Sequence, residues 1–277
     1  TLLASDGQKI SKSKKNYPDP WIFIDKYGVD ALRIYLMTSP LMKGEDVNFS
    51  EKSVQEISSK IIGRLGNVVS FYELYRDRSL EIATGNSKFS SNMLDQWILA
   101  RLNQLISEVT DGMETYDINE ASRPIENFIE DLSIWYLRRS RERIKEEGKK
   151  ALGRRSPGEA KQTLYFILKT VAKIMAPFAP FTAEDIWLKL KNEKDAESVH
   201  LGKWPEAGKI NRKIIDEMRI VRAIASFGLE ARQKEKIQVR QPLNKLEVKN
   251  FDLGEEYIKL LKDELNVKAA KQNKNIK

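Results

Sequence analysis

Four successive segments between residues 50 and 177 place apolar residues at the three- and four-residue spacing of an amphipathic helix. In one of them the apolar stripe runs through Leu94, Ile98 and Leu102. A helix of this kind carries an apolar face that is stable only when another helix covers it. The repeated stripes therefore predict a mainly α-helical chain built around a helix bundle.

Residues that cap helices give the expected bounds of this bundle. We expect helices over residues 50–78 and 92–116, from 117 past 136, over 156–177, and a shorter one from 182. Four of these helices start at a side chain that can accept a hydrogen bond from the first turn, namely Ser50, Asp117, Ser156 and Thr182. In the last case Phe181 and Ile186 would form an apolar contact across the cap.

Turn residues and changes of pattern divide the chain into four parts. Residues 1–48 are expected to form a small α/β linker that carries a loop, and residues 49–191 the helical bundle. Residues 192–211 are polar and interrupted by glycine and proline, which is typical of a connector. Residues 212–277 begin with a helical stripe and continue with strand-like alternation, so we expect a helix and a small α/β appendix.

Composition excludes several kinds of site. The 277 residues carry a formal net charge of +8, which permits a polyanionic partner without requiring one. There is no cysteine, so disulfides, thiolate metal sites and cysteine nucleophiles are excluded. His200 is the only histidine, and this rules out paired-histidine motifs and histidine metal pairs. No apolar run approaches the roughly 20 residues of a membrane span, and we expect no metal site and no membrane partner.

The loop Lys9-Ile10-Ser11-Lys12-Ser13 concentrates ammonium groups, hydroxyls and backbone amides in five residues. Such donors can follow the oxygens of a triphosphate as negative charge moves during a reaction. On these residues alone, a plain solvated turn remains the stronger alternative, because runs of charge usually just solvate a surface.

The residues that follow the loop change this balance. The loop is followed at a defined spacing by Lys26-Tyr27-Gly28-Val29-Asp30-Ala31-Leu32-Arg33. Loop, spacing and this stretch together resemble the segment of class I aminoacyl-tRNA synthetases that begins at their KMSKS loop. Two further stretches, residues 131–141 and Val239-Arg240-Gln241-Pro242-Leu243, are similar to the isoleucyl branch, isoleucyl-tRNA synthetase. The resemblance covers nearly the whole chain and corresponds to the C-terminal part of such an enzyme.

The resemblance implies roles for the loop. Lys9 and Lys12 would be catalytic, and Lys9, Ser11, Lys12 and Ser13 would bind ATP while isoleucine is activated. The full enzyme would use ATP and Mg²⁺ and esterify isoleucine tRNA. The paired-histidine half of the nucleotide site is missing from these residues. We therefore expect this chain alone to hold no cofactor and to be inactive.

A strongly basic run follows the third helical stripe. Residues 135–155 hold nine Lys or Arg and three Glu, with Arg138, Arg141 and Lys145 along one helical ridge. Because the stripe that ends at Tyr136 continues into Arg139 and Arg143, we expect the helix to leave the core here. A solvated face with internal ion pairs is the alternative on residues alone. The family resemblance favours tRNA contacts, and the expected set is Arg138, Arg139, Arg141, Arg143 and Lys145.

Other aspects of function follow the same resemblance. A cytoplasmic monomer is expected, with tRNA(Ile) as partner and with ATP and isoleucine bound through the missing half. An autonomous RNA-binding module, or a part of a valyl- or leucyl-tRNA synthetase, is the alternative. Trp135, Tyr136 and the other tryptophans are expected to pack structurally. Asp30 and Arg33 are expected to form helix-surface pairs that brace the loop-bearing linker against the bundle.

Overall fold

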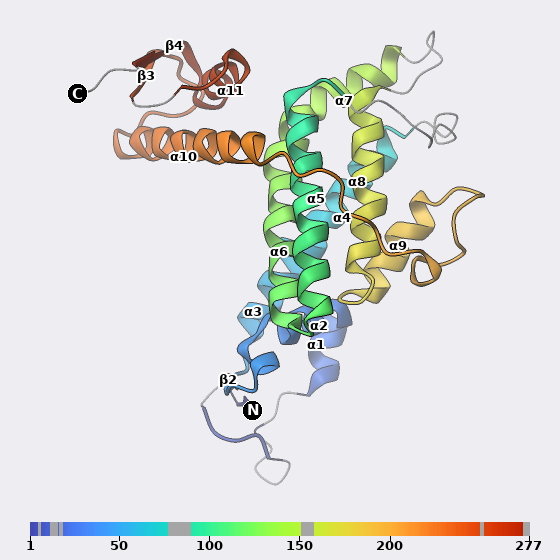
Figure 1. The fold of residues 1–277 in the computed structure, drawn as a ribbon. Helices are drawn as coiled ribbons and strands as arrows, with labels where there is room; N and C mark the ends of the chain where they lie inside the picture. Colours follow the sequence, from blue (N-terminus) through green and yellow to red (C-terminus); the bar gives the residue numbers. More distant parts are fainter. Residues whose placement is uncertain are drawn as a thin grey trace. The chain divides into compact units, whose positions relative to one another are not determined.

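The computed structural model describes residues 1–4, 7–11, 16, 19–76, 90–150, 158–249 and 252–273. These residues form two compact units, Thr1–Ile210 and Asn211–Lys277. The first is a bundle of helices with a small α/β module, and the second is a small α/β unit (Figure 1). The mainly α-helical fold predicted from the sequence is confirmed. The finer divisions at residues 48 and 191 remain predictions.

The N-terminal module combines short strands with two helices. Its elements are β1 (Leu2–Leu3), α1 (Pro20–Tyr27), α2 (Val29–Thr38), a 3₁₀ turn (Pro40–Lys43) and β2 (Val47–Asn48), with β1 and β2 parallel. Gly28 joins the two helices with φ of 85°, a left-handed conformation that glycine adopts without strain. Phe23, Tyr35 and Phe49 pack edge to face in its core. The two helices are therefore held together as one body.

The bundle contains the expected helices, with two wider segments inside them. The elements are α3 (Glu51–Ile57), the π-helical η2 (Ser58–Gly63), α4 (Arg64–Leu74), α5 (Met93–Glu114), α6 (Ile118–Glu130), the π-helical η4 (Asp131–Leu137), α7 (Arg138–Lys150), α8 (Glu159–Met175) and α9 (Pro180–Leu190). Figure 1 shows α5, α6 and α8 running alongside one another. Within this unit the N-terminal module lies at one end of the α5–α6 pair and α7 at the other (Figure 1).

Two of the expected caps form as predicted. Ser50 Oγ accepts from the amide of Ser53 at 3.2 Å, and Asp117 Oδ1 accepts from the amide of Glu120 at 2.9 Å. The predicted cap at Ser156 lies outside the described residues. The prediction for Thr182 is wrong, because α9 already begins at Pro180.

The predicted apolar contact at the start of α9 is wrong as well. Phe181 is 67% exposed, whereas Ile186 is buried. The tryptophans also differ in burial. Trp97, Trp135 and Trp187 are buried as expected, but Trp21 is 68% exposed on α1. The sequence therefore predicted burial correctly for three of these aromatic residues and wrongly for Phe181 and Trp21.

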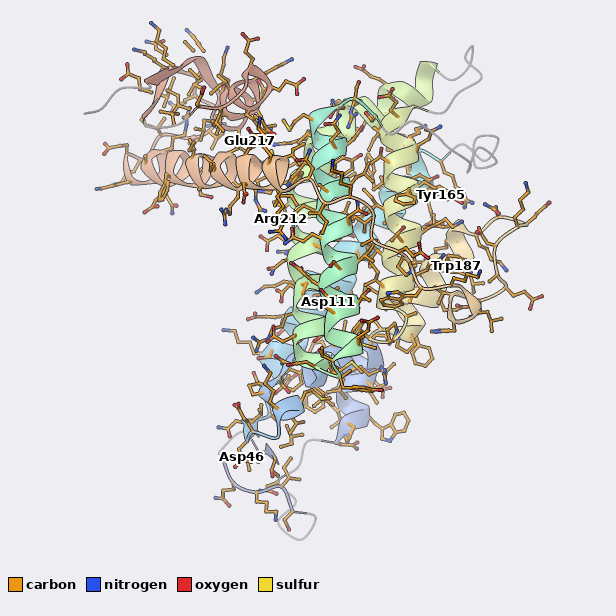
Figure 2. All side chains as sticks on the ribbon, viewed as in Figure 1. Asp46, Asp111, Tyr165, Trp187, Arg212 and Glu217 are labelled. Carbon is orange, nitrogen blue, oxygen red and sulfur yellow. The ribbon has the colours of Figure 1, made fainter. Side chains whose placement is uncertain are left out.

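The expected connector is pinned to the bundle along its length. Trp187 projects from α9, and its Nε1 donates to the Ala196 carbonyl at 3.0 Å (Figure 2). Further on, Trp204 Nε1 donates to Thr110 Oγ1 at 2.8 Å, and Asn103 Oδ1 accepts from the Gly208 amide at 3.0 Å. These bonds explain why the first compact unit extends to Ile210.

The second unit is a helix followed by a strand–helix–strand crossover. It contains α10 (Arg212–Lys234), β3 (Leu243–Lys249), α11 (Glu255–Leu265) and β4 (Val267–Asn273), with β3 and β4 parallel. The predicted helix and appendix are thus present. The apolar side of α10 differs from the predicted one in one respect, because Phe227 is exposed while Ala225 is buried.

A buried arginine organises this unit. Arg232 donates from Nη1 to the carbonyls of Gln238 and Gln241, and from Nη2 to the carbonyls of Leu265 and Asn266. The guanidinium thereby joins the end of α11 to the loop before β3. Gln241 belongs to the Val239–Leu243 stretch, for which the sequence offered no chemical role. Its main chain supplies a carbonyl that satisfies a buried charge.

No helix in the described ranges is both long and apolar enough to span a bilayer.

Candidate functional site

The loop that begins at Lys9 rises from a short antiparallel pairing. Lys9 bridges Leu3 across this pairing, and its side chain is exposed. Asn16 closes the foot of the loop, because its Oδ1 accepts from the Ser11 amide at 2.9 Å and its Nδ2 donates to the Lys9 carbonyl at 3.1 Å. Lys12 and Ser13 lie outside the described residues.

The closure by Asn16 gives the predicted nucleotide residues a defined base. Lys9 and Ser11 are held at adjacent points by one amide side chain, which leaves the Lys9 ammonium exposed to an anion. Sequence reasoning assigned no role to Asn16. Its ability to donate and accept to nearby main chain is the signal that could have identified it.

The basic run begins where the third helix of the bundle widens. The π-helical η4 passes into α7, and the two residues Ser140 and Ile144 remain buried there. The expectation that the helix leaves the core after Tyr136 is therefore wrong as far as Ile144. Arg138 and Arg141 are exposed on the opposite side. The predicted ridge of exposed basic residues is therefore present, but the helix that carries it is still packed against the bundle through Ser140 and Ile144.

Arg143 has a structural partner. Its guanidinium donates through Nη1 and Nη2 to the two oxygens of Asp95, which is fully buried, while the Arg143 side chain is 26% exposed. Tyr136 Oη donates to Asp95 Oδ1 at 2.8 Å. Arg143 Nη2 also donates to Ser140 Oγ at 3.2 Å. A bidentate pair of this kind fixes the guanidinium plane, so Arg143 anchors α7 to α5.

Two aromatic side chains, Phe71 of α4 and Tyr75 at its C-cap, extend the basic ridge. Phe71 lies under the Arg141 guanidinium, 5.5 Å from it, and packs against Tyr75 with ring centroids 4.9 Å apart. Both rings are half-buried. Arg139 lies similarly over Trp135 at 5.1 Å. Sequence reasoning assigned Tyr75 to the core stripe and did not single out Phe71.

Lys145 completes the ridge and is paired within α7. Its ammonium lies 2.8 Å from Glu142, and the hydrogen bond to this carboxylate raises the pKa of Lys145. The pair is largely exposed, so it exchanges readily with solvent ions. We call Arg138, Arg141, Lys145, Phe71 and Tyr75 the α4–α7 surface.

This combination has a known chemical use. Arginine and lysine bind phosphate oxygens, and aromatic rings beside arginine planes accept unpaired bases. Binding of this kind depends strongly on salt. The α4–α7 surface therefore has the composition of a site for a single-stranded or looped nucleic acid.

The family of the chain is decided by comparison with known domains. The family described as "Anticodon-binding domain of tRNA ligase" matches residues 95–250, more than half of the chain. This chain belongs to the anticodon-binding domain family of tRNA ligases. Residues 1–50 match a second family, "tRNA synthetases class I (I, L, M and V)".

Relatives in this family are isoleucine ligases. The chain is 38% identical over 277 residues to the isoleucine–tRNA ligase of Chlamydia trachomatis serovar D, with 96% of the chain and 26% of the relative covered. It is 36% identical over 286 residues to the isoleucine–tRNA ligase of Protochlamydia amoebophila, with 100% and 27% covered. The chain thus spans about a quarter of the length of the curated relatives it matches.

Solved structures of class I synthetases share the fold. A leucyl-tRNA synthetase of Agrobacterium radiobacter K84, solved with tRNA and LeuAMS, matches with a TM-score of 0.52 and 21% identity, covering 78% of this chain and 24% of that one. Methionyl-tRNA synthetase of Mycobacterium tuberculosis matches with a TM-score of 0.51 and 22% identity, covering 67% and 36%. At these identities the likeness establishes the fold of the family.

Proposed function

We propose that this chain is the anticodon-binding part of an isoleucine–tRNA ligase, which activates isoleucine with ATP and charges tRNA(Ile). The observation that carries the proposal is the match to isoleucine ligases along nearly the whole chain. The α4–α7 surface supports the RNA part of the proposal independently, because it rests on contacts rather than on likeness. Its substrates would place such a ligase in the cytoplasm, and we propose that it acts as a monomer.

The tRNA would bind on the α4–α7 surface. Arg138 and Arg141 are exposed and able to reach phosphates, and Lys145 exchanges its Glu142 partner for phosphate at little cost. Phe71 and Tyr75 offer ring faces to bases that leave the loop stack. In this proposal Arg143 does not touch RNA directly. It holds α7 in place through Asp95, while Arg139 lies over Trp135 beside the ridge.

The loop at Lys9 would act on the nucleotide. Lys9 and Lys12 would stabilise charge on the α-phosphate as a carboxylate oxygen of isoleucine attacks and pyrophosphate leaves, with Ser11 and Ser13 as further donors. Mg²⁺ would enter with ATP as part of the substrate. The adenine and amino-acid pockets would belong to the rest of the ligase.

A binding titration tests this function. Labelled isoleucine tRNA and a tRNA with another anticodon are titrated with the chain at two salt concentrations. The proposal predicts tighter binding of isoleucine tRNA, and weaker binding of both at the higher salt. Equal affinity for the two tRNAs would support a general RNA-binding module. Absence of binding at low salt would contradict the proposal.

A further inference from the structure

Within the first compact unit, two side chains of α2 bind the turn after α8 and the first turn of α9. Arg33 donates from Nη2 to the Pro177 carbonyl at 3.0 Å and from Nε to the Phe178 carbonyl at 3.3 Å. Asp30 Oδ2 accepts from the amide of Thr182 at 2.6 Å and from its Oγ1 at 2.7 Å. The expected bracing of the linker is therefore present, but not through helix-surface pairs. Asp30 is buried and binds α9, and Arg33 binds the turn after α8.

The charges of these two residues match the helix ends that they contact. Carbonyls left over at the end of α8 carry partial negative charge, and Arg33 donates to two carbonyls just beyond it. The first turn of α9 offers free amides with partial positive charge, and Asp30 accepts from one of them. Asp30 thus supplies, from another helix, the cap that the sequence placed on Thr182.

Asp30 is held in this position at some cost. The residue is 5% exposed, and its second oxygen, Oδ1, is buried without a hydrogen-bond partner among the described residues. A buried carboxylate oxygen without a donor is unfavourable. Asp30 therefore keeps its two hydrogen bonds to Thr182 although its other carboxylate oxygen has no donor among the described residues.

The turn connects the two candidate sites of the unit. On one side, α2 and α1 share one core through Ala31, Tyr35 and Phe23. Helix α1 begins at the residue after Asp19, and Asp19 follows Asn16, at the foot of the loop, by three positions in the sequence. On the other side, α8 spans 17 residues, about 25 Å at 1.5 Å per residue. The first turn of α8 lies beside Tyr136, because the Tyr136 Oη is 3.4 Å from the Ala160 carbonyl. Tyr136 and Arg143 both donate to the carboxylate of Asp95.

We propose that Asp30 and Arg33 are positioning residues that transmit the position of the RNA-bound bundle to the nucleotide loop. The inference rests on the proposed function. Arg33 binds two carbonyls just beyond the end of α8, and Asp30 binds Thr182 in the first turn of α9. Both attachments lie at the end of α8 that is far from the α7 anchor, so α2 follows this end of α8. RNA held on the α4–α7 surface would thus fix where the loop at Lys9 stands during charging.

The far end of α2 has a separate attachment. Asn119, fully buried on α6, donates from Nδ2 to the carbonyls of Thr38 and Ser39 at 2.7 and 3.0 Å. Loss of the Asp30 and Arg33 bonds would therefore leave the linker attached at Asn119 but able to pivot. Variants at Asp30 and Arg33 should therefore change the position of the linker without detaching it from the bundle.

The experiment compares Asp30→Asn, Arg33→Lys and Thr182→Val in the full-length ligase. Thr182→Val removes only the hydroxyl bond and is the mildest variant. Lys43→Met is the matched control, because Lys43 also joins the linker to the bundle, through exposed ion pairs with Asp117 and Glu120. The measurements are kcat and KM for tRNA charging, tRNA affinity of the 277-residue chain, and circular dichroism of each variant.

For Asp30→Asn and Arg33→Lys we expect kcat for charging to fall by about tenfold, since small misplacement of a reacting group has effects of this size or larger. KM for tRNA and the affinity of the chain should stay within about twofold, as should every value for Lys43→Met. Thr182→Val should fall between. An unchanged kcat would overturn the inference. So would a fall in kcat that is matched by an equal loss of tRNA affinity or by a loss of helical circular dichroism. If the wild-type ligase fails to charge isoleucine tRNA, the proposed function itself fails, which is a different result.

Discussion

At the scale of single residues, the buried carboxylate of Asp95 shows how one basic run can contain different kinds of arginine. Arg143 and Tyr136 both donate to it, and the carboxylate is fully buried. Arg138 and Arg141 occupy the exposed side of the same helix. The sequence treats these arginines alike, because nothing in a run of basic residues identifies which one will face an acid 48 positions away.

Arg143→Met should destabilise the chain, because it leaves Asp95 buried with one donor instead of three. Breaking one partner of a buried ion pair typically costs about 3–5 kcal/mol. Since Arg143 keeps partial exposure, we expect about 2–4 kcal/mol on that basis. Urea unfolding measures the change. Arg138→Ala is the matched control and should stay within about 0.5 kcal/mol. Equal stability of the two variants would show that the Asp95 pair is dispensable.

Lys173 of α8 should make the stability of the chain depend on pH. Burial lowers the pKa of Lys173, with a further contribution from the nearby charge of Lys169. The unfolded chain therefore holds the Lys173 proton more tightly than the folded chain, and stability rises with pH between the lowered pKa and 10.5. Lys173→Met should remove this part of the rise. The measurement is unfolding free energy across the alkaline range.

Lys169 provides the contrast for that experiment. Its ammonium binds Asp195, and both side chains are mostly buried. Lys169→Met leaves the Asn192 amide as a donor to Asp195 but removes its charged partner. We therefore expect the chain to be destabilised by about 1–3 kcal/mol, the usual effect of losing a hydrogen bond between charged groups. If Lys173→Met destabilised the chain as much as Lys169→Met at neutral pH, burial would not be the dominant influence on Lys173.

At the scale of elements, helix existence followed from sequence, whereas two local details did not. The apolar stripes and the caps at Ser50 and Asp117 predicted α3, α5 and α6 because both signals lie within a few residues of each other. The start of α9 could not be predicted in the same way, because its cap comes from Asp30 in α2. The widened segments η2 and η4 also have no local signal of this kind.

Close packing of α5 against α6 depends on Gly112. A Cβ there would lie 2.7 Å from the Ala121 amide nitrogen, and main chain cannot give way cheaply. We expect Gly112→Ala to destabilise the chain by about 1–3 kcal/mol through overpacking. Gly66, inside α4, has no atom within 4 Å of such a Cβ. Gly66→Ala should instead stabilise by about 0.5–1 kcal/mol. Thermal unfolding of both variants measures the contrast. If both substitutions changed stability in the same direction, the result would contradict this packing account.

At the scale of the whole molecule, a sequence motif and a fold supply different parts of the candidate site. The loop at Lys9 could be proposed as a nucleotide site from sequence because its lysines and serines lie within five residues and the residues that follow match the same family segment. Phe71 was not predictable as part of an RNA surface, because it meets Arg141 only when α4 and α7 pack together. The second unit adds to the basic character of the chain, since residues 211–277 carry sixteen Lys or Arg against ten Asp or Glu.

The loop can be tested in the full-length ligase. Lys12→Ala should slow adenylate formation by roughly 10²–10³, the effect of losing one transition-state donor. ATP–pyrophosphate exchange measures this step without tRNA. Lys52→Ala, on the exposed side of α3, is a suitable control and should exchange at the wild-type rate. An unchanged exchange rate in Lys12→Ala would show that the loop is not catalytic.

The salt dependence of tRNA binding by the Arg138→Ala/Arg141→Ala variant tests the α4–α7 surface most directly. Each lost phosphate contact should reduce the log–log slope by roughly one, so the variant should bind isoleucine tRNA more weakly with a slope smaller by up to about two. Its unfolding free energy should stay within about 1 kcal/mol of the wild type, because Arg138 and Arg141 are exposed and contribute only surface contacts. A variant that is equally stable and keeps the wild-type slope and affinity would place the RNA on another surface and contradict the account.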